Sequence, residues 1–359
     1  MNEKNLSSSE LIAIDTLYKK VSAHIDNARQ NVQRSIDTEM VSAYWLTGRD
    51  IVEEEQKGEK KAKYGQYLIV ALSKRLTASY KKGFSITTLK DARQFYLTYS
   101  NRLPIGHAVR GQSEHFNPNL GWIHYRALMR VTREEARSFY EIEAAKNNWA
   151  GRELERQIHS LLFDRLLKSK DKTGLLRLAT HGQEINSPVD AIKEPVVLEF
   201  LDLPESHQLV ESKLEQALID NLQSFLLELG AGFAFVKRQK RLTLDGDNFY
   251  TDLVFYHIKL KCYIIADVKV KKLTHGDIGQ MQLYVNYFDR QIKDESDNPT
   301  IGLMLCTEKN DAMVQYTLGE NNQQIFASKY ILHLPSEEDL IKELKKEVKQ
   351  LQHLMEEEK

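Results

Sequence analysis

The sequence predicts an α+β protein in which an all-α N-terminal region precedes an α/β domain with a central mixed sheet. Residues from about 11 to 99 carry apolar side chains at spacings of three and four, the period of amphipathic helices. After Pro204, short apolar runs rich in β-branched and aromatic residues alternate with helical patterns. Strands that alternate with helices are typical of α/β folds, and a predicted hairpin adds antiparallel pairing.

The N-terminal region is expected to be helical almost throughout. Its best-defined helix follows Ser85, a good N-cap residue, and Phe84 and Leu89 are placed to form a hydrophobic staple. A loop rich in Gly, Pro and Asn is predicted at 101–120. Further helices are predicted at 121–131, 133–147 and 151–168. We therefore expect residues 1–173 to form one helical domain that binds DNA or a partner.

The helix that follows Ser85 lies in a stretch with a local excess of lysine and arginine. A short break before a basic helix is typical of a winged-helix or helix-turn-helix domain, so we interpret it as a candidate recognition helix. The side chains predicted to face outward and bind nucleic acid are Thr87, Thr88, Lys90 and Arg93. Those predicted to be buried are Ile86, Leu89 and Phe95. The alternative interpretation is an ordinary basic helical surface.

Residues 174–204 are predicted to be a linker with short elements, because the pattern loosens there and Pro188 and Pro195 interrupt it. The α/β domain is expected at 205–336. A charged amphipathic helix is predicted at 337–359, and it either pairs with a second chain or lies on the surface.

The α/β domain is predicted to begin with a helix at 207–230, because Gly230 is a natural residue to end it. The order of elements that follows is β-β-β-α-β-α-β. The predicted strands are 233–239, 249–257, 261–270, 301–307 and 324–332. The predicted helices between them are 277–289 and 311–318.

Two acids and a lysine stand out in the second and third of these strands. Asp252 lies inside an apolar strand, and Asp267 and Lys269 end the next one. Residues two apart in a strand share a face, and a hairpin around 258–260 would bring Asp252 close to Asp267. Two close carboxylates repel each other unless a divalent cation lies between them, and oxygen ligands suit Mg²⁺ or Mn²⁺. The arrangement predicts a metal-dependent phosphodiesterase. Taken singly, each residue could instead be a strand-edge residue or part of a surface ion pair.

The motifs YTDLVFYHIKLKCYIIADVKVKK and GQMQLYVNYFD resemble the PD-(D/E)xK nuclease superfamily. The chain as a whole resembles the YhcG-type bacterial nucleases, which join an N-terminal domain of unknown function to such a nuclease domain. This wider resemblance is carried by AYWLTGRDIVEEEQ, GFSITTL, GWIHYRALMRV, WAGRELERQI and LEQALIDNLQSFLLELGAGFAFVKRQKRL. It implies a restriction-endonuclease-like fold for the second domain and magnesium-dependent hydrolysis of phosphodiester bonds.

The resemblance also assigns roles to single residues. Asp252 would be the first acid, Asp267 the second, and Lys269 the motif lysine. Glu215, on the preceding helix, would complete the metal site, and Gln280 would be the glutamine of the next helix. The resemblance leads us to expect glutamate at the second acid, as in I-E-L-K, whereas this chain has Asp267 in A-D-V-K.

Binding of nucleic acid is expected, with DNA as the first candidate and RNA still open. Arg238 and Lys240, at the end of the first predicted strand and just beyond it, could contact phosphates or lie in a solvated turn. A homodimer is a possible assembly, because cutting both strands of a duplex takes two sites.

The overall composition excludes a polycation. Lys and Arg number 50 against 51 Asp and Glu, so the formal net charge is −1 and any nucleic-acid binding must come from local basic patches. No apolar run has membrane-spanning length and no apolar signal core starts the chain, so we expect a cytoplasmic protein without a membrane partner. Cys262 and Cys306 lie in apolar runs and are expected to be reduced core residues, with a disulfide as the alternative.

Two further hypotheses stay open at this point. The aspartate at position 267 is one methylene shorter than glutamate, which motivates a catalytically weakened nuclease fold that acts as a nucleic-acid-binding or assembly module. A transcription regulator that acts through the N-terminal helices is the other.

Overall fold

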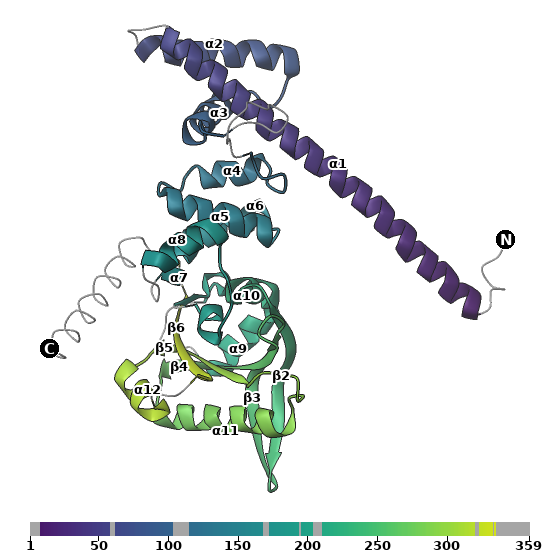
Figure 1. Cartoon of the computed structure of the whole chain (residues 1–359), viewed down its shortest axis with the longest axis vertical. Helices are drawn as coiled ribbons and strands as arrows, with labels where there is room; N and C mark the ends of the chain where they lie inside the picture. The colour runs from purple at the N-terminus through teal and green to yellow at the C-terminus, as the bar shows by residue number, and fades with distance from the viewer. Residues whose placement is uncertain are drawn as a thin grey trace, which may run out of the picture. The chain divides into compact units, whose positions relative to one another are not determined.

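The computed structural model describes residues 8–57, 62–102, 115–167, 172–193, 195–203, 210–319, 323–332 and 334. The chain divides into two compact units, Met1–Leu154 and Glu155–Lys359 (Figure 1). The helix predicted at 337–359 and most of the loop predicted at 101–120 lie outside the described residues. None of the helices within these ranges is long and apolar enough to cross a membrane.

The first unit is helical, as the sequence predicts. Its helices are α1 (Ser8–Lys57), α2 (Ala62–Tyr80), α3 (Ile86–Thr98), α4 (Trp122–Leu128) and α5 (Glu134–Lys146), and α6 (Gly151–His159) crosses into the second unit. The predicted N-cap is confirmed, because the Ser85 hydroxyl accepts a hydrogen bond from the Thr88 amide at 3.1 Å. The described residues of this unit form no strand element, so a β-hairpin wing is not among them. Helices α2 and α3 follow each other across a short turn, which is the order of elements in a helix-turn-helix domain.

The close crossing of α1 and α3 organises the core of this unit. A Cβ added at Gly48 of α1 would lie 2.0 Å from the carbonyl oxygen of Ala92, so only glycine allows this approach. Leu89 and Phe95 are fully buried, as predicted. The prediction for Ile86 was wrong, because this side chain is 39% exposed. Phe84, rather than Ile86, covers the buried cluster of Ile51, Ile69 and Leu89.

The second unit contains the predicted mixed sheet. Its strands are β1 (Val196–Val197), β2 (Phe233–Leu244), β3 (Asp247–His257), β4 (Cys262–Lys272), β5 (Ile301–Glu308) and β6 (Ile325–Ile331). They lie in the order β1-β6-β5-β4-β3-β2. The pairs among β1, β6, β5 and β4 are parallel, whereas β4–β3 and β3–β2 are antiparallel. The predicted hairpin therefore supplies the antiparallel half of the sheet.

Helices bury both faces of this sheet. On one face, α9 (Glu211–Asp220) and α10 (Leu222–Leu229) pack with β4 residues such as Ala266. On the other, α11 (His275–Gln291) and α12 (Asp311–Leu318) pack with Ile265. Neighbouring residues of β4 thus enter different cores, which explains its nearly continuous apolar run. The single helix predicted at 207–230 is interrupted at Asn221, so that α9 and α10 are separate. Cys262 and Cys306 are buried free thiols.

The segment expected to be a linker, 174–204, is largely built into the second unit. The elements around and within it are α7 (Leu162–Leu167), α8 (Lys172–His181), two 3₁₀ turns (Pro188–Ala191 and Glu199–Leu201) and β1. β1 adds an edge strand parallel to β6, with Val196 opposite Tyr330, and Val197 and Leu198 are fully buried. The chain divides after Leu154, not after residue 173. A two-residue strand is too short for a periodic sequence signal, so the loosened pattern was interpreted as a linker.

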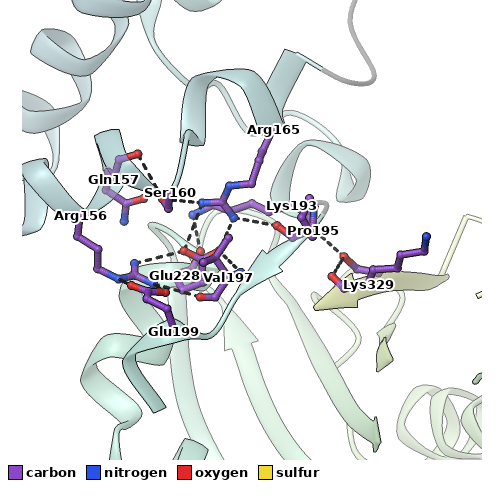
Figure 2. A network of polar contacts seen from close by, with 11 residues as sticks. Arg156, Gln157, Ser160, Arg165, Lys193, Pro195, Val197, Glu199, Glu228 and Lys329 are labelled. Carbon is purple, nitrogen blue, oxygen red and sulfur yellow. Dashed lines mark hydrogen bonds and ion pairs between the residues drawn. The ribbon is translucent and has the colours of Figure 1, made fainter. Parts of the chain in front are cut away.

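A buried ion-pair network attaches this segment to the sheet (Figure 2). The Glu228 carboxylate of α10 accepts hydrogen bonds from Arg165 Nη1 at 2.5 Å and from the Val197 amide at 2.9 Å. Arg156 lies 3.3 Å from the same carboxylate and also binds Glu199. Burial alone would raise the pKa of Glu228, but Arg165 and its basic neighbours outweigh it and lower the pKa. The carboxylate is therefore ionised, and it joins α7, α10 and the β1 strand.

We predict that Arg165→Met destabilises the second unit by about 3–5 kcal/mol, because it leaves the Glu228 charge buried without its main partner. The double variant Arg165→Met/Glu228→Met should cost less than the single one, since both charges are then gone. Urea unfolding followed by far-UV circular dichroism measures the change. The fluorescence of Trp45, Trp122 and Trp149, which all lie in the first unit, is the internal control. A single variant as stable as the parent chain would contradict a structural role for this ion pair.

Candidate active site

The two predicted acids face each other across the pair of β3 and β4. The ladder runs from His257 opposite Cys262 to Leu253 opposite Ala266, and Asp252 and Asp267 are the next residue of each strand beyond its end. Oδ2 of Asp252 accepts a hydrogen bond from the Val268 amide at 2.9 Å. The carboxylate of Asp252 is thereby held against β4, beside that of Asp267. The juxtaposition on which the sequence interpretation depended is present.

Lys269 completes this group from the same strand. Its Nζ lies 2.9 Å from Oδ2 of Asp267 and 4.0 Å from Oε2 of Glu211. Burial alone would lower the pKa of Lys269, but Asp267, and to a lesser extent Glu211 and Asp252, raise it above the ordinary lysine value. The side chain is therefore a fixed ammonium at neutral pH. We call Asp252, Asp267 and Lys269 the acid–lysine group.

The two acids of the acid–lysine group favour binding of a further positive charge, either a proton or a cation. Burial, followed by the neighbouring Asp267, raises the pKa of Asp252 to about 8, against the opposing effects of the Val268 amide and Lys269. At pH 7 the metal-free pair of acids thus keeps a proton that an exposed aspartate would release. Paired carboxylate oxygens are ligands for hard divalent cations, and such a cation would displace this proton. The donor set fits Mg²⁺ or Mn²⁺.

Helix α11 borders the group on the face of the sheet that Ile265 and Asp267 share. Tyr284 is 1% exposed, and its hydroxyl donates to the Tyr250 carbonyl at 2.9 Å. Gln280 Nε2 donates to the Tyr284 hydroxyl at 2.5 Å. Burial raises the pKa of Tyr284, and Asp267 and Asp252 raise it further. Gln280 is thus hydrogen-bonded to Tyr284, whose pKa the two acids raise. The side chain of Gln280 itself is exposed.

Glu215 and Arg238 are bound to each other. Oε1 of Glu215 accepts a hydrogen bond from Arg238 Nε at 2.7 Å, and Oε2 accepts one from Gln239 at 3.1 Å. α9 covers the face of the sheet opposite to α11, so its buried Glu215 meets β2. The roles of Glu215 as a metal ligand and of Arg238 as a phosphate contact stay predictions. Lys240 is half-buried on β2, opposite Thr251.

Glu211 is the helix acid that the sequence interpretation missed. It lies one turn before Glu215 on α9, and its carboxylate is the one that approaches Lys269. The spacing of four between the two glutamates, which puts both on one face of the helix, could have indicated it. In the ranges that the structure describes, no three His, Cys, Asp or Glu side chains form a ready metal-binding cluster. Of the three predicted metal ligands, the structure brings Asp252 and Asp267 together, and their role in binding a metal stays a prediction.

The candidate recognition helix α3 offers only part of its predicted surface. Thr87 and Lys90 are exposed. Thr88 is half-buried, and its hydroxyl lies 2.9 Å from that of Ser85. Arg93 is held against α1 by an ion pair of 2.6 Å with Glu55. Thr87 and Lys90 are therefore the predicted residues that remain directly available to a nucleic acid.

Comparison with known proteins identifies the family. Residues 189–349 match the YhcG PDDEXK nuclease domain, and residues 20–165 match the DUF1016 N-terminal domain. The chain is 38% identical, over 363 residues, to the Escherichia coli (strain K12) protein named "Putative nuclease YhcG", covering 95% of this chain and 96% of that protein. The chain belongs to the YhcG family. The nuclease domain of the family starts at residue 189, inside the segment that contributes β1.

Two solved structures are similar to part of this chain. A repair endonuclease from Pyrococcus abyssi matches with a TM-score of 0.24 and 14% identity, over 37% of this chain and 50% of that one. A structure titled "Structure of EndoMS-dsDNA2 complex" matches with a TM-score of 0.25 and 12% identity, over the same shares. The matched part is thus about half the length of these proteins.

We predict that the acid pair makes the metal-free second unit less stable as pH rises. Folded Asp252 keeps its proton to about pH 8, whereas an unfolded aspartate loses it near pH 4. Between these values the folded state binds more protons, so the free energy of unfolding falls as pH increases. Asp252→Asn should remove this dependence and stabilise the unit at pH 8 in EDTA by on the order of 1 kcal/mol. Melting curves at pH 5 and pH 8 test it, with Asp247→Asn, at an exposed position of the same strand, as the control. Parallel pH dependence in parent and Asp252→Asn would refute the assignment.

Proposed function

We propose that this protein is a metal-dependent nuclease that hydrolyses phosphodiester bonds, with DNA as its substrate and Mg²⁺ or Mn²⁺ as its cofactor. The observation that carries the proposal is the acid–lysine group: two carboxylates opposed across β3 and β4, with the Lys269 ammonium 2.9 Å from Asp267. Membership of a family with a nuclease domain supports the same reaction.

Each residue of the group has a distinct task. Asp252 and Asp267 would hold the cation, which when bound supplies charge to the scissile phosphate and an acidified water. The hydrogen bond from the Val268 amide fixes the Asp252 carboxylate, so the acids do not have to be ordered when the cation arrives. Lys269 places its ammonium where negative charge builds up on the phosphate during hydrolysis.

A second candidate function is a nucleic-acid-binding module whose nuclease fold has lost catalysis. Its motivation is the aspartate at position 267 in place of the expected glutamate. Two observations favour the active enzyme. The shorter Asp267 still reaches Lys269, and it lies close enough to Asp252 to raise the pKa of that carboxyl. The closeness of the two acids is what a cation-binding pair requires, and the contact with Lys269 keeps the motif lysine beside it.

The N-terminal unit would supply binding to nucleic acid. α3 presents Thr87 and Lys90 to solvent next to the exposed Lys81–Lys82 turn, and phosphate contacts from such residues position a protein on a duplex without reading its sequence. The expected location of such an enzyme is the cytoplasm.

We predict that Asp252→Ala and Lys269→Met each reduce divalent-dependent cleavage of DNA by about 10³-fold or more, because each removes part of the group that stabilises the transition state. Lys271→Ala is the matched control, since it removes an exposed lysine two residues further along β4 and should keep full activity. Single-turnover cleavage of a labelled panel of duplex, nicked and single-stranded substrates, with RNA included, gives the rates.

Calorimetric titration separates the two candidate functions. An active enzyme binds Mn²⁺ with an affinity that increases up to about pH 8, as the cation displaces the proton of the acid pair. DNA binding without any binding of Mn²⁺ or Mg²⁺ would favour the inactive module. Cleavage that survives Lys269→Met unchanged would contradict the roles assigned to the acid–lysine group.

We predict that Lys90→Ala weakens binding of DNA by roughly threefold at physiological salt and reduces the slope of log K against log salt by about 1, because one phosphate contact is lost. Lys259→Ala removes the same charge from the β3–β4 turn of the other unit and is the control. Fluorescence anisotropy at several salt concentrations measures both variants. Equal slopes for parent and Lys90→Ala would exclude α3 from the interface.

A further inference from the structure

Helix α1 carries an apolar stripe that its own unit leaves exposed. The C-terminal half of α1 packs on α3, where Val41 and Trp45 are buried. The N-terminal half continues beyond the helices of the bundle (Figure 1). Every side chain described between Ile14 and Ile36 is exposed, apart from the half-buried Ser22. About half of a 50-residue helix therefore lacks tertiary cover within the described residues of its unit.

Six residues of this half follow the spacing of a two-stranded coiled coil, whereas the exposed Leu17 and Ile36 fall at flanking positions. Successive positions alternate steps of four and three, which places them at the d and a positions of a heptad. The six positions, which we call the α1 seam, are Ile14, Tyr18, Val21, Ile25, Ala28 and Val32. The five large side chains among them are 46–68% exposed. A single helix with such a seam buries it only by pairing.

We propose that the α1 seam pairs in antiparallel orientation with the α1 seam of a second copy of this chain, forming a homodimer. The inference uses α1 alone, and it stands or falls independently of the proposed nuclease activity.

Side-chain size favours this pairing. When the a and d positions of two antiparallel copies are aligned in layers, Tyr18 of one copy faces Ala28 of the other, so the largest residue of the seam meets the smallest. In the other layers, Val21 faces Ile25. Ile14 faces Val32. Each layer occurs twice by symmetry, and no layer joins two large aromatic rings.

Charge favours the antiparallel orientation over the parallel one. The same register places Asp15 of one copy beside Arg29 of the other at the flanking positions, which gives two symmetry-related ion pairs. A parallel register would instead place His24 beside Arg29 and would stack Tyr18 on Tyr18. The sequence of the seam therefore matches an inverted copy of itself.

The buried area is sufficient for a specific dimer. The seam spans about 28 Å of helix, and with the stems of its flanking residues it would remove roughly 1,200 Å² of surface from water, the lower end of the range for stable interfaces. A second copy provides this surface without any further partner.

The test is the mass of the full chain in solution, measured by size-exclusion chromatography with light scattering over a range of concentrations. The parent chain should be a dimer. Val21→Asp should weaken dimerisation at least about a hundredfold, because it buries a carboxylate in two layers. Ala23→Asp is the matched control: it adds the same charge two residues along, on the outward face of α1, and should leave the dimer intact. Because both positions are exposed in the single chain, neither change should alter the thermal unfolding of the two units.

A charge exchange tests the orientation. Asp15→Arg and Arg29→Asp should each weaken the dimer roughly tenfold, since like charges then meet twice. The double variant should restore the parent affinity, and a mixture of the two single variants should form a mixed dimer. A monomeric parent chain, a dimer that Val21→Asp leaves unchanged, or single variants without rescue would each overturn the proposal. Single variants without rescue are also the result expected if residues 337–359, rather than a second α1, occupied the seam.

Discussion

The close approach of two carboxylates across β3 and β4 is the constraint around which the second unit is arranged. Two neighbouring acids are tolerated because the Val268 amide binds Asp252 and the Lys269 ammonium binds Asp267. In the absence of a cation the pair also keeps a proton, which removes one of the two negative charges. Packing of helices on both faces of the sheet fixes the strands that carry these groups. The chemistry therefore depends on a pairing register, in which a slip by one residue would turn Asp252 away from Asp267.

The Glu228 carboxylate, in another part of the second unit, is fully paired and serves the structure instead of binding a cation. Glu228 is fully buried and ionised, and its partners come from α7 and from the segment that leads into β1. Buried ion pairs add little net stability compared with apolar packing, but they penalise alternative arrangements heavily, because any misplacement leaves a charge unpaired. The Glu228 network therefore specifies how residues 155–203 attach to the sheet. The acid pair, by contrast, holds unfavourable electrostatic energy that a bound cation would relieve.

Much of this arrangement could be predicted from the sequence, and the failures have physical causes. Asp252, Asp267 and Lys269 could be placed together because carboxylates within apolar strands are costly and strand periodicity fixes their side. The order of strands and helices along the chain after residue 230 followed from the alternating strand and helix patterns. β1 was missed because two residues carry no period. The spacing of four puts Glu211 and Glu215 on one face of α9, but which of them approaches Lys269 depends on how the helix crosses the sheet, and local spacing does not decide that.

The position of β1 in the sheet has a consequence for how the protein is made. Val196 pairs with Tyr330, so the outer edge of the sheet joins segments more than 130 residues apart in the chain. During translation, the earlier segment is synthesised well before its neighbour strand, so this edge of the sheet cannot pair until β6 has emerged. The strands that carry both acids are synthesised within this interval. A nascent chain thus completes its sheet only after β6 has been synthesised, when the strands that carry the acids have already emerged.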